Sequence, residues 1–395
     1  METGTAVRPY DVVLFGATGF VGELTAEYLA EHAPADCRWA LAGRSLGKLT
    51  ALRDRLAARR PGCAGIPLLV ADSTDPESLR ELAGAARVVA STVGPYVWYG
   101  EELVAACAEA GTDYLDLTGE AEFVDTMYVR YDARARETGA RLVHACGFDS
   151  VPHDLGVYFT VQQLPEGVPL RIDGFVRAGA IFSGGTFASA LTAFGRGREI
   201  LRAAHQRRLH EPRLVTRRAR APLGGPRFSR ETGTWALPLP TLDPQVVARS
   251  ARALDRYGPD FRYRHYASVK TLPMALGGSA VVSAGALAAQ LPFVRNWLMG
   301  RYEPGQGPSA ERRARSWFTV RFVGEGGGRR VFTEVSGGDP GYDETAKMLA
   351  ESALCLAFDD LPKTSGQVTT AVAMGGALVD RLVAAGLRFR VAHSG

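Results

Sequence analysis

The sequence predicts an α/β fold in which a doubly wound parallel sheet is followed by a second α/β domain built on a mixed sheet. Two observations predict it. Up to residue 150, short runs rich in β-branched and aromatic residues alternate with segments of helical spacing. Beyond that point the alternation ends, and two apolar/polar alternating runs, 316–324 and 329–336, flank Glu325-Gly326-Gly327-Gly328 as in a β-hairpin.

Residues 1–150 are expected to form the first domain. Strands joined by helical segments pair in parallel through right-handed crossovers, which place helices on both faces of the sheet. The expected strands span residues 10–15, 38–42, 66–71, 87–92, 114–117 and 141–145. The expected helices span residues 20–32, 48–60, 76–82, 101–110 and 122–138.

Residues 151–340 are expected to form the second domain, and residues 341–395 a set of C-terminal helices. In the second domain we expect a strand at 171–176, a turn at Ser183-Gly184-Gly185, and an arginine-rich insert at 196–230 that reads as a helix followed by an exposed loop. The C-terminal helices are predicted at 342–358 and 369–385, the second ended by Gly386.

Length, composition and charge exclude several classes of protein. A chain of 395 residues with 46% hydrophobic and 22% charged residues is long enough for two or three packing units and is not a disordered chain. Its 46 basic and 42 acidic residues nearly cancel, so nucleic acid is not an expected partner. The five cysteines form no Cys-x-x-Cys pair and no secretion signal is visible, which favours a cytoplasmic location.

The strongest local motif joins the first strand to the first helix and reads Gly16-Ala17-Thr18-Gly19-Phe20-Val21-Gly22. Gly16 permits the tight turn, Gly19 lets backbone N–H groups approach a pyrophosphate, and Gly22 lets the helix pack close to the strand. At the first turn of an alternating pattern, this motif predicts a Rossmann-type dinucleotide-binding domain in which these residues contact the cofactor.

The end of the second strand indicates which dinucleotide is bound. NAD-binding domains place a carboxylate there, whereas this chain has Arg44 and Ser45, which suit a ribose 2′-phosphate. NADPH is therefore the expected cofactor. Asp72, after the third strand, could bind the adenine amino group or could serve only as a turn residue.

Two further strand ends are expected to border the nicotinamide, because ligands bind at the carboxyl ends of parallel strands. After the fourth strand, the loop Thr92-Val93-Gly94-Pro95 should lie over the nicotinamide ribose. Polar residues follow the fifth strand at 116–120 and the sixth at 146–154.

Taken together, five segments resemble the saccharopine dehydrogenase family, and within it the trans-acting enoyl reductase branch. The segments are Gly-Ala-Thr-Gly-Phe-x-Gly, Ala-Gly-Arg-Ser, Val-Gly-Pro-Tyr, Asp-Leu-Thr-Gly-Glu and Gly-Phe-Asp-Ser-x-Pro, and residues 370–378 extend the likeness to the C-terminal helix. The resemblance implies that the last helices return to pack on the first domain. It also implies an NADPH-dependent oxidoreductase that transfers a hydride to the β-carbon of an α,β-unsaturated acyl or polyketide thioester in lipid or polyketide biosynthesis.

Two other functions stay open at this stage. One is a saccharopine-dehydrogenase-like oxidoreductase acting on an imine or amino acid, and the other is a non-catalytic nucleotide-binding scaffold at membranes. The expected substrate is a small molecule or a carrier-bound acyl chain. An acyl-carrier or polyketide synthase partner fits the first function, and the second domain could bind substrate or form a homodimer.

Enoyl reduction also needs a proton donor and a group that stabilises the developing enolate oxygen. We expect Tyr96 first, since its loop should border the nicotinamide, although it could merely stack on the ring. Ser150 and His153 are further candidates, as is Tyr99.

Two carboxylates near the sixth strand allow different roles. Asp149 and Asp154 could bind a substrate amine or could cap a helix that begins near Pro152. No His-x-x-x-His motif, cysteine cluster or carboxylate pair is present, so no metal is expected.

Two segments of the second domain have several interpretations. The arginine-rich insert could be a solvated helix face, a docking surface for an acidic acyl-carrier domain, or a contact with anionic lipid. Residues 271–294 carry no charge, but Ala, Gly and Ser dominate them, which favours a buried or interfacial helix over peripheral membrane contact.

Overall fold

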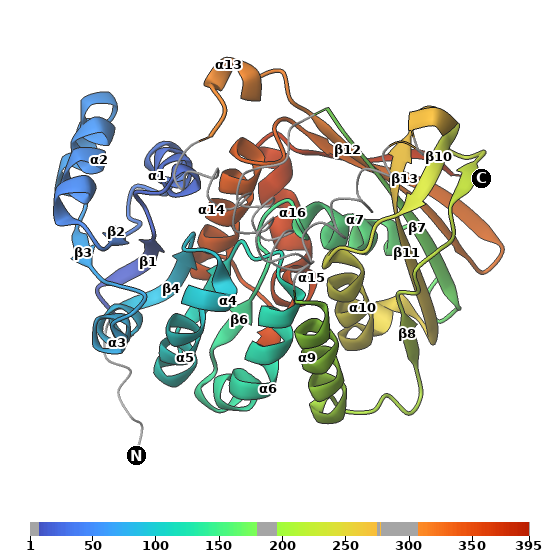
Figure 1. Ribbon diagram of the computed structural model, residues 1–395, viewed down its shortest axis with the longest axis horizontal. Coiled ribbons are helices and arrows are strands. Elements are labelled where there is room, and N and C mark those ends of the chain that lie inside the picture. The colour runs from blue at the N-terminus through green and yellow to red at the C-terminus, as the bar shows by residue number, and fades with distance from the viewer. Residues whose placement is uncertain (1–7, 180–195, 275–276, 278–306, 395) are drawn as a thin grey trace.

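The computed structural model describes residues 8–179, 196–274, 277 and 307–394, which form two β-sheets with helices packed on and between them (Figure 1). The first sheet has seven strands, all parallel, in the order β3-β2-β1-β4-β5-β6-β14. Its strands are β1 (Tyr10–Phe15), β2 (Trp39–Gly43), β3 (Leu68–Val70), β4 (Ala86–Ser91), β5 (Asp113–Asp116), β6 (Arg141–Val143) and β14 (Gly366–Val368).

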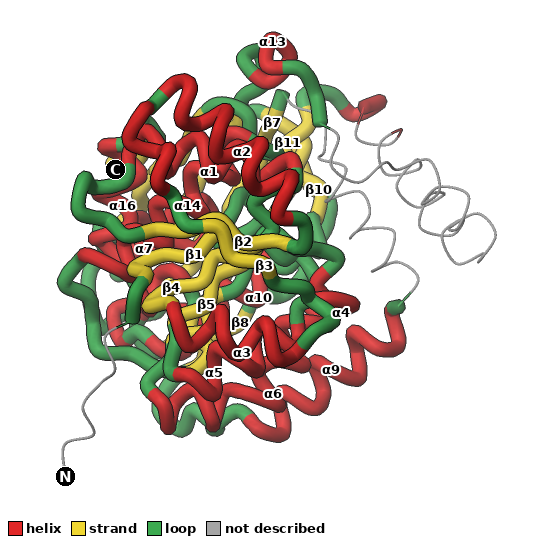
Figure 2. Tube along the Cα trace, turned by 90° about the vertical axis from the view of Figure 1, so that its left-hand side faces the viewer, coloured by secondary structure: helices red, strands yellow, loops and turns green. Residues whose placement is uncertain are grey.

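Helices cover both faces of this sheet (Figure 2). Alternate residues of β1 face opposite sides, so Val12 and Leu14 enter one hydrophobic core while Val13 and Phe15 enter the other. One face packs against α1 (Phe20–His32), α2 (Leu46–Arg59) and α14 (Asp343–Phe358), and the other against α3 (Pro76–Ala85), α5 (Glu101–Ala110) and α6 (Ala121–Thr138). The predicted doubly wound sheet is therefore confirmed.

The second sheet has eight strands and is mixed, as predicted. Its order is β15-β13-β12-β7-β11-β10-β9, with β8 beside β11, and β11 runs parallel to both β7 and β8. Its strands are β7 (Leu170–Ala178), β8 (Arg218–Arg220), β9 (Arg227–Ser229), β10 (Thr234–Pro238), β11 (Asp260–Val269), β12 (Phe318–Gly326), β13 (Arg329–Gly337) and β15 (Arg388–Ser394). The predicted hairpin is the β12–β13 pair.

The remaining helices join the two sheets. Figure 1 shows α7 and α14 between them, with α7 on β12 and β13 and α14 on α1 and β4. The helices outside the first sheet's two layers are α7 (Val151–Val161), α9 (Gly197–His210), α10 (Asp243–Ala253), α15 (Thr370–Ala373) and α16 (Gly375–Ala384). Short helical turns are α4 (Tyr96–Tyr99), α13 (Ala310–Arg313), η1 (Pro61–Gly65) and η2 (Asp255–Tyr257).

The arginine-rich insert contains the predicted helix, α9, which packs on α6. The largely exposed residues after it are not all loop, because they contribute the short strands β8 and β9 to the second sheet. Arg207 is buried, with its guanidinium 3.9 Å from the ring centre of Tyr128 and a hydrogen bond of 2.5 Å to Gln367 Oε1. This arginine therefore fixes α9 to its neighbours and does not belong to a solvated helix face.

The C-terminal region also differs from the prediction of one helix over 369–385. That segment divides into α15 and α16 at Gly375, whose φ of +48° interrupts the helix. The strand β15 follows Gly386 and is absent from the sequence prediction. The division of the chain into domains at residues 150 and 340 stays a prediction.

Two segments singled out in the sequence lie mostly or wholly outside the described residues. They are the glycine-rich turn at 183–185 and the uncharged segment 271–294. In the part of the chain that the structure describes, no helix is both long enough and apolar enough to span a membrane.

Candidate active site

The glycine turn at the end of β1 is packed so closely that side chains are excluded from it. Gly16 has a φ of +83°, and a Cβ atom there would lie 2.7 Å from both Thr92 Oγ1 and Val93 Cγ2. A Cβ at Gly22 would lie 2.2 Å from the carbonyl oxygen of Gly16. The hydroxyl of Thr92 donates to that carbonyl at 3.0 Å. The turn is thus tied to the start of α1 and to the loop after β4.

The beginning of α1 offers backbone N–H groups without a side chain over them. Its N-cap residue is Gly19, and no side chain of the described residues caps the helix. A Cβ at Gly19 would meet only the Gly16 carbonyl oxygen, at 3.4 Å. An open helix N-terminus after a glycine turn fits a pyrophosphate. The cradle formed by residues 16–22, including Ala17, Thr18 and Phe20, therefore suits a dinucleotide.

The predicted 2′-phosphate residues, Arg44 and Ser45, follow β2, and the predicted adenine contact, Asp72, follows the neighbouring strand β3. Arg44 is exposed, and Ser45 is the N-cap of α2, where its hydroxyl accepts from the N–H of Lys48 at 3.4 Å. Asp72 accepts from the N–H and the hydroxyl of Thr74, each at 2.9 Å. These hydrogen bonds, helped by the charge of Arg44, hold the pKa of Asp72 below its ordinary value. Asp72 thus has a turn role, whether or not it also contacts adenine.

Tyr96 lies where its loop was expected, but its hydroxyl is already engaged. It is buried, donates to the carbonyl of Ser91 at 3.0 Å, and accepts from the N–H of Leu117 at 3.1 Å. Burial, with the charge of Asp116, raises the pKa of Tyr96 well above its ordinary value. Since its proton is used inside the protein, the geometry opposes the predicted role of Tyr96 as proton donor. The side chain instead joins the ends of β4 and β5.

Glu120, which follows the neighbouring strand β5, holds the rest of this loop. The backbone N–H groups of Tyr96 and Val97 donate to the carboxylate of Glu120, at 3.2 and 2.8 Å. The segment Thr92-Val93-Gly94-Pro95 therefore lies between two fixed points, the glycine turn and Glu120. Tyr99, the further tyrosine candidate, is exposed.

The ends of β5 and β6 are linked by a buried carboxylate. Asp116 accepts from the N–H of Ala145 at 2.9 Å, from the N–H of Thr118 at 3.1 Å, and from Nδ1 of His144 at 2.6 Å. Ala145 is the only non-glycine among the described residues with a positive φ, 60°. Backbone strain of this kind concentrates at functional sites. Tyr96 joins the ends of β4 and β5, and Asp116 joins the ends of β5 and β6, so these three strand ends form one connected rim.

Asp154, a predicted amine-binding candidate, is enclosed by other elements. It lies in the first turn of α7, and its carboxylate accepts from Ser250 Oγ at 2.5 Å, from Thr370 Oγ1 at 2.8 Å and from the N–H of Ala371 at 2.8 Å. It therefore binds the start of α15 and the face of α10, and its geometry opposes both predicted roles, amine binding and capping of the helix near Pro152.

Other residues of the 146–154 loop form a polar cluster between the two sheets. A Cβ at Gly119 would lie 3.0 Å from Oδ2 of Asp149, so Asp149 faces the loop after β5. Burial raises the pKa of Asp149 to about 6. The hydroxyl of Ser150 is buried and has no hydrogen-bond partner among the described residues. Among the described residues, this buried hydroxyl is therefore not used by another protein group.

His153 lies deeper, beside two residues that sequence reasoning missed. Its ring packs on that of His265, with centroids 4.9 Å apart, and its Nε2 lies 3.4 Å from Asp243 Oδ1. Burial, with the neighbouring His265, lowers the pKa of His153 well below its ordinary value. No local motif surrounds Asp243 or His265.

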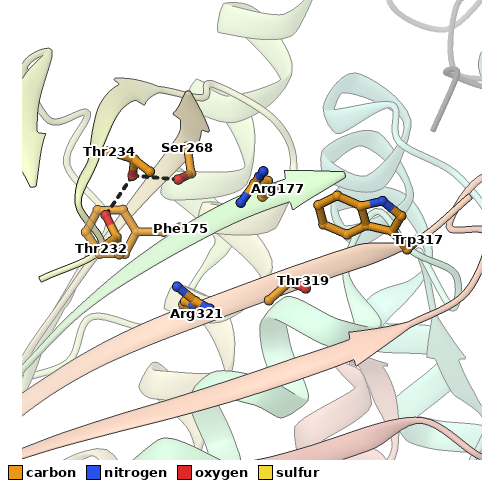
Figure 3. A pocket seen from close by; sticks show the side chains of 8 residues that line it. All are labelled: Phe175, Arg177, Thr232, Thr234, Ser268, Trp317, Thr319 and Arg321. Carbon is orange, nitrogen blue, oxygen red and sulfur yellow. Dashed lines mark hydrogen bonds between the residues drawn. The ribbon is translucent and has the colours of Figure 1, made fainter. Parts of the chain in front are cut away.

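A separate small pocket lies in the second sheet, with a volume of about 60 Å³ (Figure 3). Hydroxyl groups of Thr232, Thr234 and Ser268 form a hydrogen-bonded chain at one side of it. None of the predicted site residues lines it. The lining residues are Phe175, Arg177, Thr232, Thr234, Ser268, Trp317, Thr319 and Arg321.

The doubly wound sheet with its open glycine cradle defines a dinucleotide-dependent oxidoreductase. Residues 12–143 match the model of the saccharopine dehydrogenase NADP-binding domain. The chain is 40% identical to a protein of Mycobacterium tuberculosis (strain H37Rv) named as a candidate trans-acting enoyl reductase, over 96% of this chain and 97% of that one. It is 36% identical to a trans-acting enoyl reductase of Mycobacterium ulcerans, over 97% and 98% of the two chains.

The chain therefore belongs to the saccharopine dehydrogenase family, in the branch of the trans-acting enoyl reductases. Its fold is similar to that of apo saccharopine dehydrogenase (L-Glu forming) from Saccharomyces cerevisiae, with a TM-score of 0.57 at 12% identity, over 97% of this chain and 100% of that chain. The predicted family, the NADP-dependent oxidoreductase class and NADPH as cofactor are confirmed.

Proposed function

We propose that the protein is an NADPH-dependent enoyl reductase that acts on an α,β-unsaturated acyl or polyketide thioester carried by a partner protein. The observation that supports this most is the similarity to proteins of that name along nearly the whole of both chains. The similarity includes the second sheet as well as the cofactor domain, so it extends beyond a shared nucleotide-binding fold.

In this proposal, the cofactor is held along the carboxyl edge of the first sheet. When bound, NADPH supplies the hydride that is transferred to the β-carbon. The residues around the glycine turn hold the pyrophosphate through backbone N–H groups, Arg44 and Ser45 hold the 2′-phosphate, Asp72 lies at the adenine, and the loop over residues 92–95 borders the nicotinamide ribose.

We assign the substrate carbonyl oxygen to Ser150. Its hydroxyl is buried without a hydrogen-bond partner among the described residues, at the N-cap of α7 after β6. A hydroxyl preorganised in a buried site stabilises a developing enolate oxygen without first leaving another partner.

The rival function, oxidation or reduction at an imine or amino acid, is less well supported. It requires a carboxylate that can receive a substrate amine, and Asp154 is not available because three protein donors enclose it. Asp149 is the remaining carboxylate in the loop.

The substrate would be presented by an acyl-carrier domain of a polyketide synthase in lipid or polyketide biosynthesis. The reaction would take place in the cytoplasm. Docking of the carrier, a homodimer and contact with a membrane surface stay predictions.

Steady-state oxidation of NADPH tests the proposal. The full chain is assayed with a crotonyl thioester and, separately, with a keto acid plus an amine. We expect NADPH consumption with the thioester and a saturated acyl product. Consumption only with the keto acid and amine would support the rival, and cofactor binding without turnover of any enoyl thioester would contradict the proposal.

A further inference from the structure

Three ligand-type side chains from separate elements meet in the core between the sheets. His153 lies in the first turn of α7, Asp243 begins α10, and His265 lies in β11. One nitrogen of each histidine and one carboxylate oxygen lie within 4.8 Å of one another. The side chains are only 3%, 4% and 1% exposed. Burying polar and ionisable groups is costly unless they are hydrogen-bonded, paired or bound to a metal ion, so this cluster needs such a partner.

Hydrogen bonding within the cluster does not explain it. Nε2 of His153 lies 3.4 Å from Asp243 Oδ1, and Nε2 of His265 lies 3.7 Å from Asp243 Oδ2. Both separations exceed the usual 2.7–3.2 Å of an N–H···O hydrogen bond, about 2.9 Å on average. Asp243 Oδ1 and His265 Nε2 are buried without a hydrogen-bond partner among the described residues. Native proteins rarely leave such atoms unpaired.

We propose that His153, Asp243 and His265 bind a divalent transition-metal ion of the zinc type. A tetrahedral ion with ligands about 2.0–2.1 Å away holds those ligands roughly 3.4 Å from one another. The separations of 3.4 Å to Oδ1 and 3.7 Å to Oδ2 of Asp243 approach this value, and one ligand atom of each residue lies within 4.8 Å of the other two. Two imidazoles and one carboxylate leave a coordination position for water or another oxygen ligand. The ligand role replaces the proton-donor role predicted for His153.

Neighbouring groups orient two of the ligands. Nδ1 of His265 lies 2.7 Å from the hydroxyl oxygen of Tyr263. Metal-binding histidines usually donate their other ring N–H to a nearby oxygen. When Nδ1 of His265 donates to Tyr263, the lone pair on Nε2 is free for the ion. The hydroxyl of Thr241 donates to Oδ2 of Asp243 and orients the carboxylate in turn.

This proposal goes beyond the enoyl reductase function and does not depend on it.

Cobalt binding tests the proposal independently of catalysis. The full chain is treated with EDTA, dialysed and titrated with Co²⁺, whose visible absorption reports its coordination. We expect one Co²⁺ per chain, displaced by Zn²⁺, and a higher melting temperature with Zn²⁺ but not with Mg²⁺, which prefers oxygen ligands.

Matched variants separate this site from general effects of burying a histidine. His265→Gln and Asp243→Asn should lose the cobalt absorption. His144→Gln should retain it, because His144 is similarly buried but contacts Asp116 outside the cluster. The proposal would be overturned if the unmodified chain took up no more than a trace of cobalt. It would also be overturned if His265→Gln bound cobalt as the unmodified chain does. The measurement on the unmodified chain decides even where a variant does not fold.

Discussion

A Cβ atom at Gly22 would lie 2.2 Å from the carbonyl oxygen of Gly16. This contact links the last glycine of the turn motif to the first, and it sets how closely α1 packs on the end of β1. The motif is therefore needed for packing as well as for cofactor binding, because the same backbone that a side chain would displace forms the phosphate cradle.

Gly22→Ala should weaken both stability and cofactor binding. We expect a loss of about 1–3 kcal/mol in the free energy of unfolding, as for other overpacked sites. NADPH affinity should fall at least about tenfold as the cradle shifts. Denaturant unfolding and fluorescence titration measure the two effects.

Gly84→Ala in α3 is the matched control, because a Cβ there would meet nothing within 4 Å. Alanine at this helical position should leave NADPH affinity unchanged and raise stability by up to about 1 kcal/mol. Full stability and affinity in Gly22→Ala would contradict the packing argument.

Tyr96→Phe should affect stability more than turnover. The substitution leaves the carbonyl of Ser91 and the N–H of Leu117 buried without their partner, which should cost about 1–3 kcal/mol. Turnover should fall less than about tenfold, since a lost proton donor typically costs roughly 10²–10⁴. Chemical unfolding and the rate of NADPH oxidation distinguish the two. A stable variant with a turnover rate reduced a thousandfold would restore the catalytic assignment.

Ser150→Ala should lower turnover more than stability. Because its hydroxyl has no partner among the described residues, its removal should leave the melting temperature unchanged or higher. Loss of a hydrogen bond to the enolate oxygen should lower kcat by about 10².

Ser352→Ala is the control for Ser150, since the buried Ser352 hydroxyl donates to the Met348 carbonyl at 2.7 Å. It should lose about 0.5–1.5 kcal/mol of stability and keep its turnover. Unchanged kcat in Ser150→Ala would remove Ser150 from the active site.

Asp11→Asn should change how stability depends on pH. Burial raises the pKa of Asp11, but the hydrogen bonds and charge of Arg38 outweigh this and hold its pKa below the ordinary 3.8. Because the folded-state pKa is lowered, the stabilisation is present above pH 3.8 and is lost as the pH falls through the folded-state pKa. Melting curves at pH 7 and at a pH below the folded-state pKa of Asp11 should show a destabilised variant only at the higher pH. An equal loss at both would contradict this account.

Local sequence patterns predicted the first sheet well. The bounds expected for β1, α1 and α5 match the structure, because glycines or a strand-like run mark those boundaries within a few residues. The cofactor class followed from Arg44 and from the absence of a carboxylate at the same strand end. Such signals depend only on neighbours along the chain.

Long-range contacts could not be predicted from one sequence. His153, Asp243 and His265 come from α7, α10 and β11 and meet through the tertiary fold, and nothing adjacent to Asp243 or His265 marks them. The enclosed hydroxyl of Tyr96 depends on Leu117 from the next strand. In the sequence, Arg207 looks like the exposed arginines around it. It is buried because α9 packs on α6, where its guanidinium lies over Tyr128.

We infer that the chain selects NADPH through the glycine cradle and Arg44. Fluorescence titration of the unmodified chain and of Arg44→Ala with NADPH and NADH is the decisive experiment. We predict tighter binding of NADPH than of NADH, a loss of roughly 10- to 100-fold in NADPH affinity in Arg44→Ala, and unchanged NADH affinity. Equal affinities for the two cofactors in the unmodified chain, or full NADPH affinity in Arg44→Ala, would contradict the claim.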